Sequence, residues 1–217
     1  LCVTDDFQSL GDIVISETIV SDFQYSDGSV DSLHLELPVG FLFSTTGIVT
    51  VSTNGGDVIG TPTVTVTSTK VKMALVVGNT DAAVDILTIS GLEVKSNSPT
   101  VSVFLSRIAT SDDVTFLGLE VATNANYADL NGYTYPLGVT AGTDLEVCNT
   151  ASIPISGNDP TPFTGTWSPL DGDNVANASN FSTSVTGVLQ GETGRFEWEV
   201  DNNGCAVSDT VLVTNKT

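Results

Sequence analysis

The chain has 217 residues, enough for one large β-sandwich or two small ones, and carries a net charge of −20 because 6 Lys and Arg face 26 Asp and Glu. Nucleic acid and anionic membrane surfaces are poor partners for such a chain, since phosphate binding needs clustered cations. The sequence contains no run of about 18 apolar residues, so it predicts no membrane-spanning helix. A charged fraction of only 15% argues against a disordered acidic tail.

Short strand patterns recur through the first half of the chain, each rich in β-branched residues and bounded by Gly, Pro, Asn or Asp. Residues 33–37 are the clearest, because leucines alternate with His34 and Glu36 in the period of two that a half-buried strand requires. Similar segments occupy residues 12–16, 48–52, 63–67, 71–77, 86–89 and 101–105. No stretch has helical spacing of apolar residues, so we expect almost no helix and one antiparallel sandwich ending near residue 121.

The second half of the chain predicts a smaller β-unit. Residues 122–142 are interpreted as a final edge strand followed by a linker, and strand-like segments resume near Leu145 and continue to Val213. Residues 201–204 read Asp-Asn-Asn-Gly, which is typical of a tight hairpin turn because Asn and Gly accept positive φ. We therefore predict an all-β chain of two antiparallel sandwich domains in series, residues 1–142 with a linker from about 122, and residues 143–217.

Residues spread along the second unit match the pattern of a known type of module. They are Cys148, Ser156, Gly157, Asn158, Pro160, Gly165, Thr166, Trp167, Leu189, Gly191, Phe196, Glu197, Trp198, Val200, Asn203, Gly204, Cys205, Ser208, Asp209, Thr210 and Val211. In this order they resemble the PKD-like, immunoglobulin-like modules of large surface proteins of the Bacteroidetes phylum. Residues 12–17, 22–23, 37–43 and 87–92 are similar, more loosely, to N-terminal sandwich domains of exported proteins from that group. The resemblance implies export, a place in adhesin, gliding or filament-like assemblies, and no catalytic residues.

Three cysteines suit an exported protein with one disulfide and one remaining thiol. Cys148 and Cys205 lie near the first and last strands of the second unit, which are neighbours in an immunoglobulin-like sandwich, so we expect them to form the disulfide. Trp167 and Trp198 are then expected to pack in the core near this bridge. Cys2 remains, as a buried thiol, as a link to another subunit, or as the partner of a cysteine outside this sequence.

Few residues support catalysis. His34 is the single histidine and lies on the polar face of its strand, so neither a Ser-His-Asp site nor a zinc site has its ligands. An acidic pair could hydrolyse glycosides, but 26 acids provide too many pairs to single one out. We predict no catalytic residues and no enzyme activity.

Calcium is the one cofactor that the composition favours, because hard cations need several oxygen ligands. The best local cluster is Asp171-Gly172-Asp173-Asn174, with Asp171 and Asp173 as the ligands, followed by Asp5-Asp6, Asp81–Asp85 and Asp112-Asp113. None has the spacing of an EF-hand loop, and solvated acids in turns are the alternative interpretation.

Two kinds of glycan attachment are possible from the sequence. The resemblance implies O-glycosylation at Asp-Ser/Thr-aliphatic patterns, which makes Ser32 and Thr210 candidates. Asn177, Asn180 and Asn215 open Asn-x-Ser/Thr sequons, which matter only in a host that attaches N-glycans.

The function we expect is that of a non-catalytic, extracellular structural or adhesive module of a bacterial surface protein, cut from a longer chain. Its partners would be neighbouring copies or domains of that protein, or glycans. Residues 1–10 or 127–139 could be donated to a neighbouring sheet edge. The alternative is a carbohydrate-binding module of a secreted hydrolase, for which the exposed aromatic candidates are Phe41, Phe43, Tyr127, Tyr133 and Tyr135. The ligand is not identified by the sequence.

Overall fold

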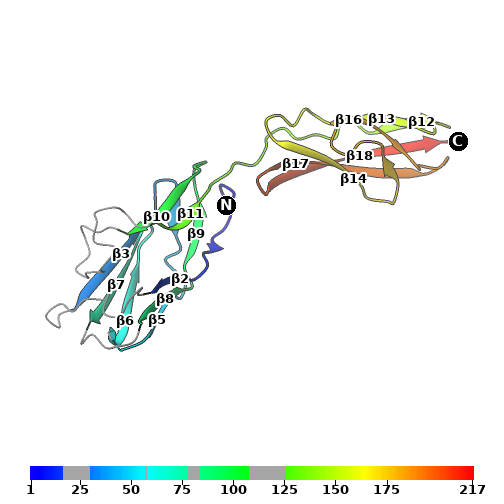
Figure 1. Cartoon of the computed structure of the whole chain (residues 1–217). Helices are drawn as coiled ribbons and strands as arrows, with labels where there is room; N and C mark the ends of the chain where they lie inside the picture. The colour runs from blue at the N-terminus through cyan, green and yellow to red at the C-terminus, as the bar shows by residue number, and fades with distance from the viewer. Residues whose placement is uncertain (17–29, 57, 78–83, 108–125) are drawn as a thin grey trace. The chain divides into compact units, whose positions relative to one another are not determined.

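The computed structural model describes residues 1–16, 30–56, 58–77, 84–107 and 126–217, and the regular structure in these ranges is entirely β (Figure 1). The chain divides into two compact units, Leu1–Gly132 and Tyr133–Thr217, called unit 1 and unit 2 below. The all-β prediction with two sandwiches is confirmed. The division between the units falls ten residues before the predicted boundary, because residues 133–142, assigned to a linker, belong to unit 2.

Unit 1 contains three sheets. The largest has the order β11-β10-β3-β7-β6, and the smaller ones have the orders β1-β9-β4 and β2-β8-β5. The strands are β1 (Gln8–Ser9), β2 (Ile13–Ser16), β3 (Asp31–Glu36), β4 (Phe41–Phe43), β5 (Thr50–Asn54), β6 (Val58–Val66), β7 (Lys70–Val77), β8 (Ile86–Ser90), β9 (Glu93–Ser96), β10 (Val103–Arg107) and β11 (Asn126–Leu130). All strand pairs in this unit are antiparallel among the described residues.

The core of unit 1 follows from alternation along the strands. In β7, Val71, Met73, Leu75 and Val77 are buried, and the residues between them face away from the core. Buried side chains from all three sheets form one hydrophobic cluster, so the sheets enclose a single core. Burying alternate apolar residues is the main stabilising contribution to such a sandwich, at roughly 25 cal/mol per Å² of apolar surface.

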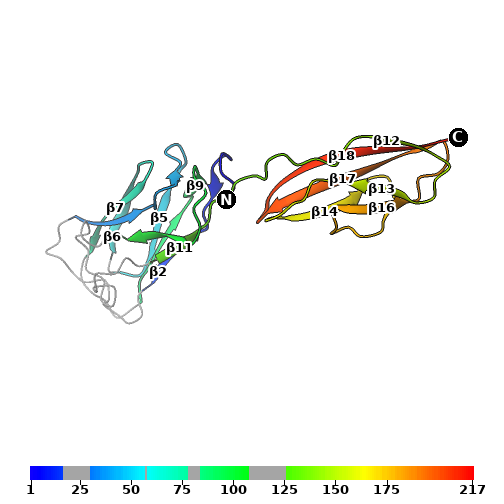
Figure 2. The same ribbon diagram turned by 90° about the horizontal axis from the view of Figure 1, so that it is seen from above.

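Unit 2 contains two sheets, with the orders β12-β18-β17-β14 and β13-β16-β15. The strands are β12 (Leu145–Cys148), β13 (Ile153–Ser156), β14 (Thr164–Pro169), β15 (Asn174–Val175), β16 (Ser182–Thr186), β17 (Thr193–Asn202) and β18 (Cys205–Lys216). The first strand, β12, lies parallel to the last, β18, and the other strands of this unit pair antiparallel (Figure 2). Two facing sheets joined in this order form an immunoglobulin-like sandwich.

The hairpin between β17 and β18 forms where it was predicted. Asn203 and Gly204 both have positive φ, 53° and 89°, and Gly204 N–H donates to the Asp201 carboxylate over 2.8 Å. This two-residue turn matches the right-handed twist of the strands that it joins. It fixes the ten-residue register between β17 and β18, from Thr193 opposite Thr214 to Asn202 opposite Cys205.

The two tryptophans form the centre of the unit 2 core, as predicted, but without the Cys148–Cys205 bridge that was expected beside them. Trp167 and Trp198 are cross-strand partners, 2% and 0% exposed, with ring centroids 5.1 Å apart and planes tilted by 39°. The Trp198 ring lies directly against Gly157 and Gly165, and a Cβ at either glycine would collide with it. These two glycines are therefore required for close packing, and the tryptophans are buried instead of presented to a ligand.

The predicted disulfide between Cys148 and Cys205 is wrong. Cys148 is a free, exposed thiol, whereas Cys2 and Cys205 are the disulfide-bonded cysteines. The reason is the parallel pairing, which places Cys148 opposite Lys216 at the far end of the strand that Cys205 begins. A strand of this length separates the two cysteines by roughly 36 Å, and bridging requires a Cα separation under about 7 Å.

No helix in the described ranges is long and apolar enough to cross a membrane.

Candidate functional site

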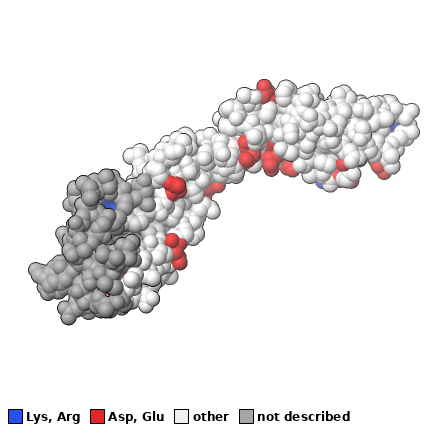
Figure 3. Space-filling model, viewed as in Figure 1, with Lys and Arg blue, Asp and Glu red and all other residues white. Residues whose placement is uncertain are grey.

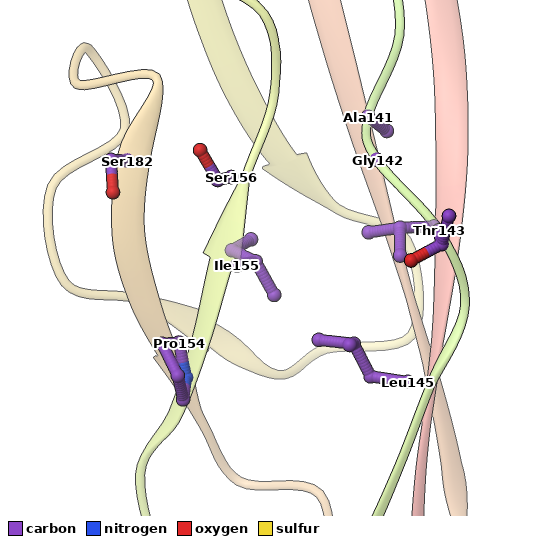
Figure 4. Close-up of a pocket in the computed structure, with 9 residues that line it drawn as sticks. Ala141, Gly142, Thr143, Leu145, Pro154, Ile155, Ser156 and Ser182 are labelled. Atoms are coloured by element: carbon purple, nitrogen blue, oxygen red, sulfur yellow. The ribbon is translucent and has the colours of Figure 1, made fainter.

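Unit 2 has a groove of about 330 Å³, which lies between strand β13 and the segment of chain that leads into β12 (Figure 4). The side chains of Leu145 and Ile155 point into the space between the two strands. The groove is lined by Ala141, Gly142, Thr143, Leu145, Pro154, Ile155, Ser156, Ser182 and Val211. These residues include no acid, base or thiol, so the groove can accept apolar groups but provides no general acid or base.

The edge of β13 beside this groove is closed to strand addition. Gly157 N–H donates to Phe181 O on the β16 side, so the alternate residues Pro154 and Ser156 turn their backbone outward. Pro154 has no N–H to offer an incoming strand. Asn158 N–H donates to Thr140 O over 3.0 Å, so the chain before β12 covers the end of this edge.

The edge of β14 is closed in the same way. Leu170 N–H donates to Arg195 O on β17, which leaves the backbone of Trp167 and Pro169 facing outward. Trp167 N–H is bonded to Ala178 O over 2.8 Å, and Pro169 has no N–H. Edge strands blocked by proline and covered by loops are a common protection against edge-to-edge association.

The segments predicted as donor strands are already paired inside unit 1. Within residues 1–10, β1 pairs with β9, and Leu10 N–H donates to Leu92 O over 2.8 Å. Within residues 127–139, β11 pairs with β10. Donation to a neighbour would first require these strands to leave their own sheets.

The predicted calcium ligands lie at one end of unit 2 with different surroundings. Asp171 accepts three hydrogen bonds from the Arg195 guanidinium, the shortest 2.8 Å, and one from Arg195 N–H. These bonds hold the pKa of the Asp171 carboxyl below its usual value. A cation at Asp171 would have to displace this guanidinium, and no group of three or more His, Cys, Asp or Glu in the described residues could hold a metal ion. Calcium binding stays a prediction.

Asp173 lies beside the Asp171–Arg195 ion pair and does not take part in it. Its carboxylate packs against Gly194 and Gly187, where a Cβ would lie 2.5 Å and 3.0 Å from its oxygens, and it accepts no hydrogen bond from the described residues. Partial burial, reinforced by the charges of Asp171 and Glu192, raises the pKa of the Asp173 carboxyl. Asp81 and the Asp112-Asp113 pair lie outside the described residues.

The surface is acidic with little basic compensation (Figure 3). Both cations of unit 2, Arg195 and Lys216, are paired with carboxylates, Asp171 at 2.8 Å and Glu146 at 2.6 Å. On β17 the remaining charged side chains of the outer face are carboxylates flanked by Ser and Thr of the adjacent strands. The face is therefore hydrophilic and anionic.

His34 lies on β3, where its Nε2 is 3.0 Å from Ser32 Oγ and its cross-strand neighbour is Lys72.

The two O-glycosylation candidates differ in accessibility. Ser32 is only 4% exposed in β3, so the folded unit does not present it to a modifying enzyme. Thr210 is exposed on β18, opposite Glu197. The N-glycosylation sequons also differ in accessibility. Asn177 and Asn180 are exposed in the loop before β16. Asn215 is only 4% exposed, and its side-chain amide forms hydrogen bonds with the backbone of Thr150 and Val188.

The aromatic candidates for carbohydrate binding are mostly committed to the fold. Phe41 and Phe43 are each 1% exposed and belong to the unit 1 core. Tyr127, Tyr133 and Tyr135 are half-buried, and Tyr127 packs against the same core. Two of the five candidates are therefore unavailable to a ligand.

Sequence reasoning missed contacts between residues that lie far apart in the sequence of unit 2. Arg195 binds Asp171 across 24 residues, and Asn215 binds Thr150 across 65 residues. The first contact depends on the antiparallel register of β14 with β17, and the second on the parallel pairing of β12 with β18, and no local pattern records either of them. The only available signal was the rarity of Arg and Lys, which implies that each one has a carboxylate near it.

No protein-family model matches the sequence, and no curated protein does. Among solved structures the chain is similar to the titin domains Z1Z2 in complex with telethonin, with 9% identity, a TM-score of 0.27 and coverage of 97% of this chain and 99% of that one. It is also similar to titin A168169 (12%, 0.26, 99% and 97%) and to the tandem Ig repeats of Dlar (10%, 0.26, 86% and 100%). At these scores the superpositions carry no argument about function. The strand order of unit 2 is that of an immunoglobulin-like sandwich, and the chain is composed of two β-sandwich units.

Proposed function

We propose that the chain is a non-catalytic, extracellular structural module of a bacterial surface protein, which acts through rigid β-sandwiches and an anionic surface. The observation that carries this proposal is the way in which unit 2 uses its polar residues. Its two cations, its buried Asn215 and its edge prolines all serve the integrity of the sandwich, and its groove has no chemically active side chain.

Two further features support an extracellular location. Cys2 and Cys205 are disulfide-bonded, and disulfides persist in oxidising surroundings. The surface combines a net charge of −20 with many Ser, Thr and Asn side chains, which favours solubility outside the cell.

Two of the four edge strands of unit 2, β13 and β14, are closed to strand addition, which directs the proposal towards a spacer or display module. Polymerisation by strand addition needs an edge with free backbone groups, and both β13 and β14 carry an outward-facing proline. An adhesive role would then depend on side chains of the outer faces.

Surface labelling of intact source cells tests the location. Antibodies against the purified chain should label the cells without permeabilisation, and protease added outside should remove the label. Labelling that appears only after permeabilisation would contradict the proposal. Turnover of a peptide or polysaccharide substrate by the purified chain would contradict its non-catalytic part.

A further inference from the structure

The disulfide closes most of the chain into a covalent ring. The chain has three cysteines, Cys148 is a free thiol, and Cys2 and Cys205 are the bonded pair. The ring runs from residue 2 to residue 205, so it contains almost all of unit 1 and every strand of unit 2 before β18. Outside the ring are Leu1 and the chain after Cys205, which consists of the rest of β18 and Thr217.

Strand β18 is an inner strand of the larger sheet of unit 2. It pairs with β12 on one side and with β17 on the other, where the register is continuous from Cys205 opposite Asn202 to Thr214 opposite Thr193. Its 12 residues therefore form one extended segment that spans unit 2 (Figure 2). A β-strand rises about 3.3 Å per residue and a fully stretched chain at most about 3.6 Å, so such a segment has almost no slack.

Tension follows the shortest covalent path between its two points of attachment. When residues 1 and 217 are pulled apart, that path runs from Cys2 across the disulfide to Cys205 and then along β18. The rest of the ring is a second, far longer branch, which stays unloaded as long as the short branch is intact. No strand pairing inside the ring has to break for the short branch to bear the load, because every link in it is a covalent bond.

Buried contacts keep the sandwich attached to the loaded strand. Val211 and Val213 of β18 are 1% and 0% exposed in the unit 2 core, and Cys205 is buried at the start of the strand. Near the other end of β18, the Asn215 amide bonds to both backbone groups of Thr150. The apolar contacts and the two strand ladders therefore hold the sheet against β18 while the strand is taut.

We propose that the disulfide and β18 form one continuous load-bearing path, and that the two units lie outside this path and stay folded under tension. Two units joined only through the backbone would be loaded in series and would unfold one after the other. The bond between Cys2 and Cys205 makes the chain a nearly inextensible tether instead. This inference goes beyond the structural role proposed above, which requires no resistance to force.

Single-molecule force spectroscopy on the whole chain tests this path. Peptide tags added before Leu1 and after Thr217 attach the handles, so no cysteine is needed for coupling. Both proteins carry Cys148→Ser, which removes the free exposed thiol. The second protein also carries Cys2→Ser, which opens the ring by replacing one sulfur atom at a half-buried position. Tryptophan fluorescence before the measurement checks that unit 2 is folded in both proteins, because both tryptophans belong to its core.

We expect the closed-ring protein to lengthen by less than about 20 Å before a handle detaches, because only the slack of β18 and of the two terminal residues is available. Opening the ring adds the residues between 2 and 205 to the loaded chain. The Cys2→Ser protein should therefore lengthen in large steps, with a total contour of up to about 700 Å.

Large steps in the closed-ring protein, or equal lengthening of the two proteins, would overturn the proposal. A disulfide-linked dimer of the closed-ring protein on a non-reducing gel would also overturn it, because the bond would then join two chains. Labelling of intact cells is independent of these results, so the load-bearing path and the proposed location fail separately.

Discussion

Asp173 gives the sharpest prediction about stability. Its carboxylate is pressed against Gly194, close to the apolar side chains of Val188 and Phe196, and no described donor satisfies it. Partial burial is the largest cause of its raised pKa, and the charges of Asp171 and then Glu192 add to it. Asp173→Asn keeps the shape of the side chain and removes the charge.

The sign of the pH effect follows from the direction of the pKa shift. The pKa of Asp173 is raised above its usual value of 3.8, so the proton binds more tightly to the folded state than to the unfolded state. The stabilisation from protonation is complete below pH 3.8 and is lost as the pH rises through the raised value. At neutral pH the charged Asp173 therefore destabilises unit 2.

The magnitude is that of a partly exposed like-charge contact, about 0.5 to 1 kcal/mol after solvent screening. For a domain of this size, that corresponds to a rise in Tm of about 2 to 8 °C for Asp173→Asn at pH 7. The gain should shrink as the pH falls through the raised pKa of Asp173, because the wild-type carboxyl then becomes protonated as well.

Tryptophan fluorescence is the assay, because both tryptophans of the chain lie in the unit 2 core and report only its unfolding. Glu199→Gln is the matched control, since it makes the same change in net charge on an exposed part of β17. The reasoning is refuted if Asp173→Asn stabilises no more than Glu199→Gln, or if its gain is the same at pH 7 and pH 4.

Three other predictions concern unit 2. Alkylation followed by mass spectrometry should label Cys148 without reduction and the remaining cysteines only after it; protection of Cys148 before reduction would restore the predicted bridge. Gly165→Ala should lower the free energy of unfolding by about 1 to 3 kcal/mol, because its methyl group meets the Trp198 ring, and an unchanged denaturant midpoint would contradict this packing. Asp209→Ala should remove stability that exists above pH 3.8 and is lost below it, because the bond from Ala141 N–H lowers the pKa of Asp209; a pH profile of Tm that is parallel to wild type would contradict this.

The sequence predicted those parts of the fold that local patterns control. Alternating leucines in residues 33–37 placed β3 correctly, because one polar and one buried face leave only one orientation for the strand. The turn at Asn203-Gly204 was predictable because its backbone needs positive φ at both positions. The two tryptophans were predictable as core residues because large aromatic side chains between β-branched neighbours are best buried.

The parts that depend on long-range register were not predictable. Cys148 and Cys205 occur near the ends of the right strands, but a parallel pair places them at opposite ends of the ladder, and periodicity contains no information about strand direction. The burial of Ser32 could not be read either, because its own strand alternation places it on the polar face with His34. The sequence indicated Asn215 only as a possible glycosylation site. Its structural role was not predictable, because its hydrogen-bond partners lie 27 and 65 residues away.

Amide hydrogen exchange along residues 144–150 tests the closure of unit 2 most directly. If β12 is held against β18 by the ladder and by Asn215, the amides of this edge segment that donate to β18, including those of Asn149 and Thr150, exchange much more slowly than loop amides, and Asn215→Ala accelerates Thr150 selectively. Exchange of all these amides at the rate of an unprotected loop would contradict the parallel pairing.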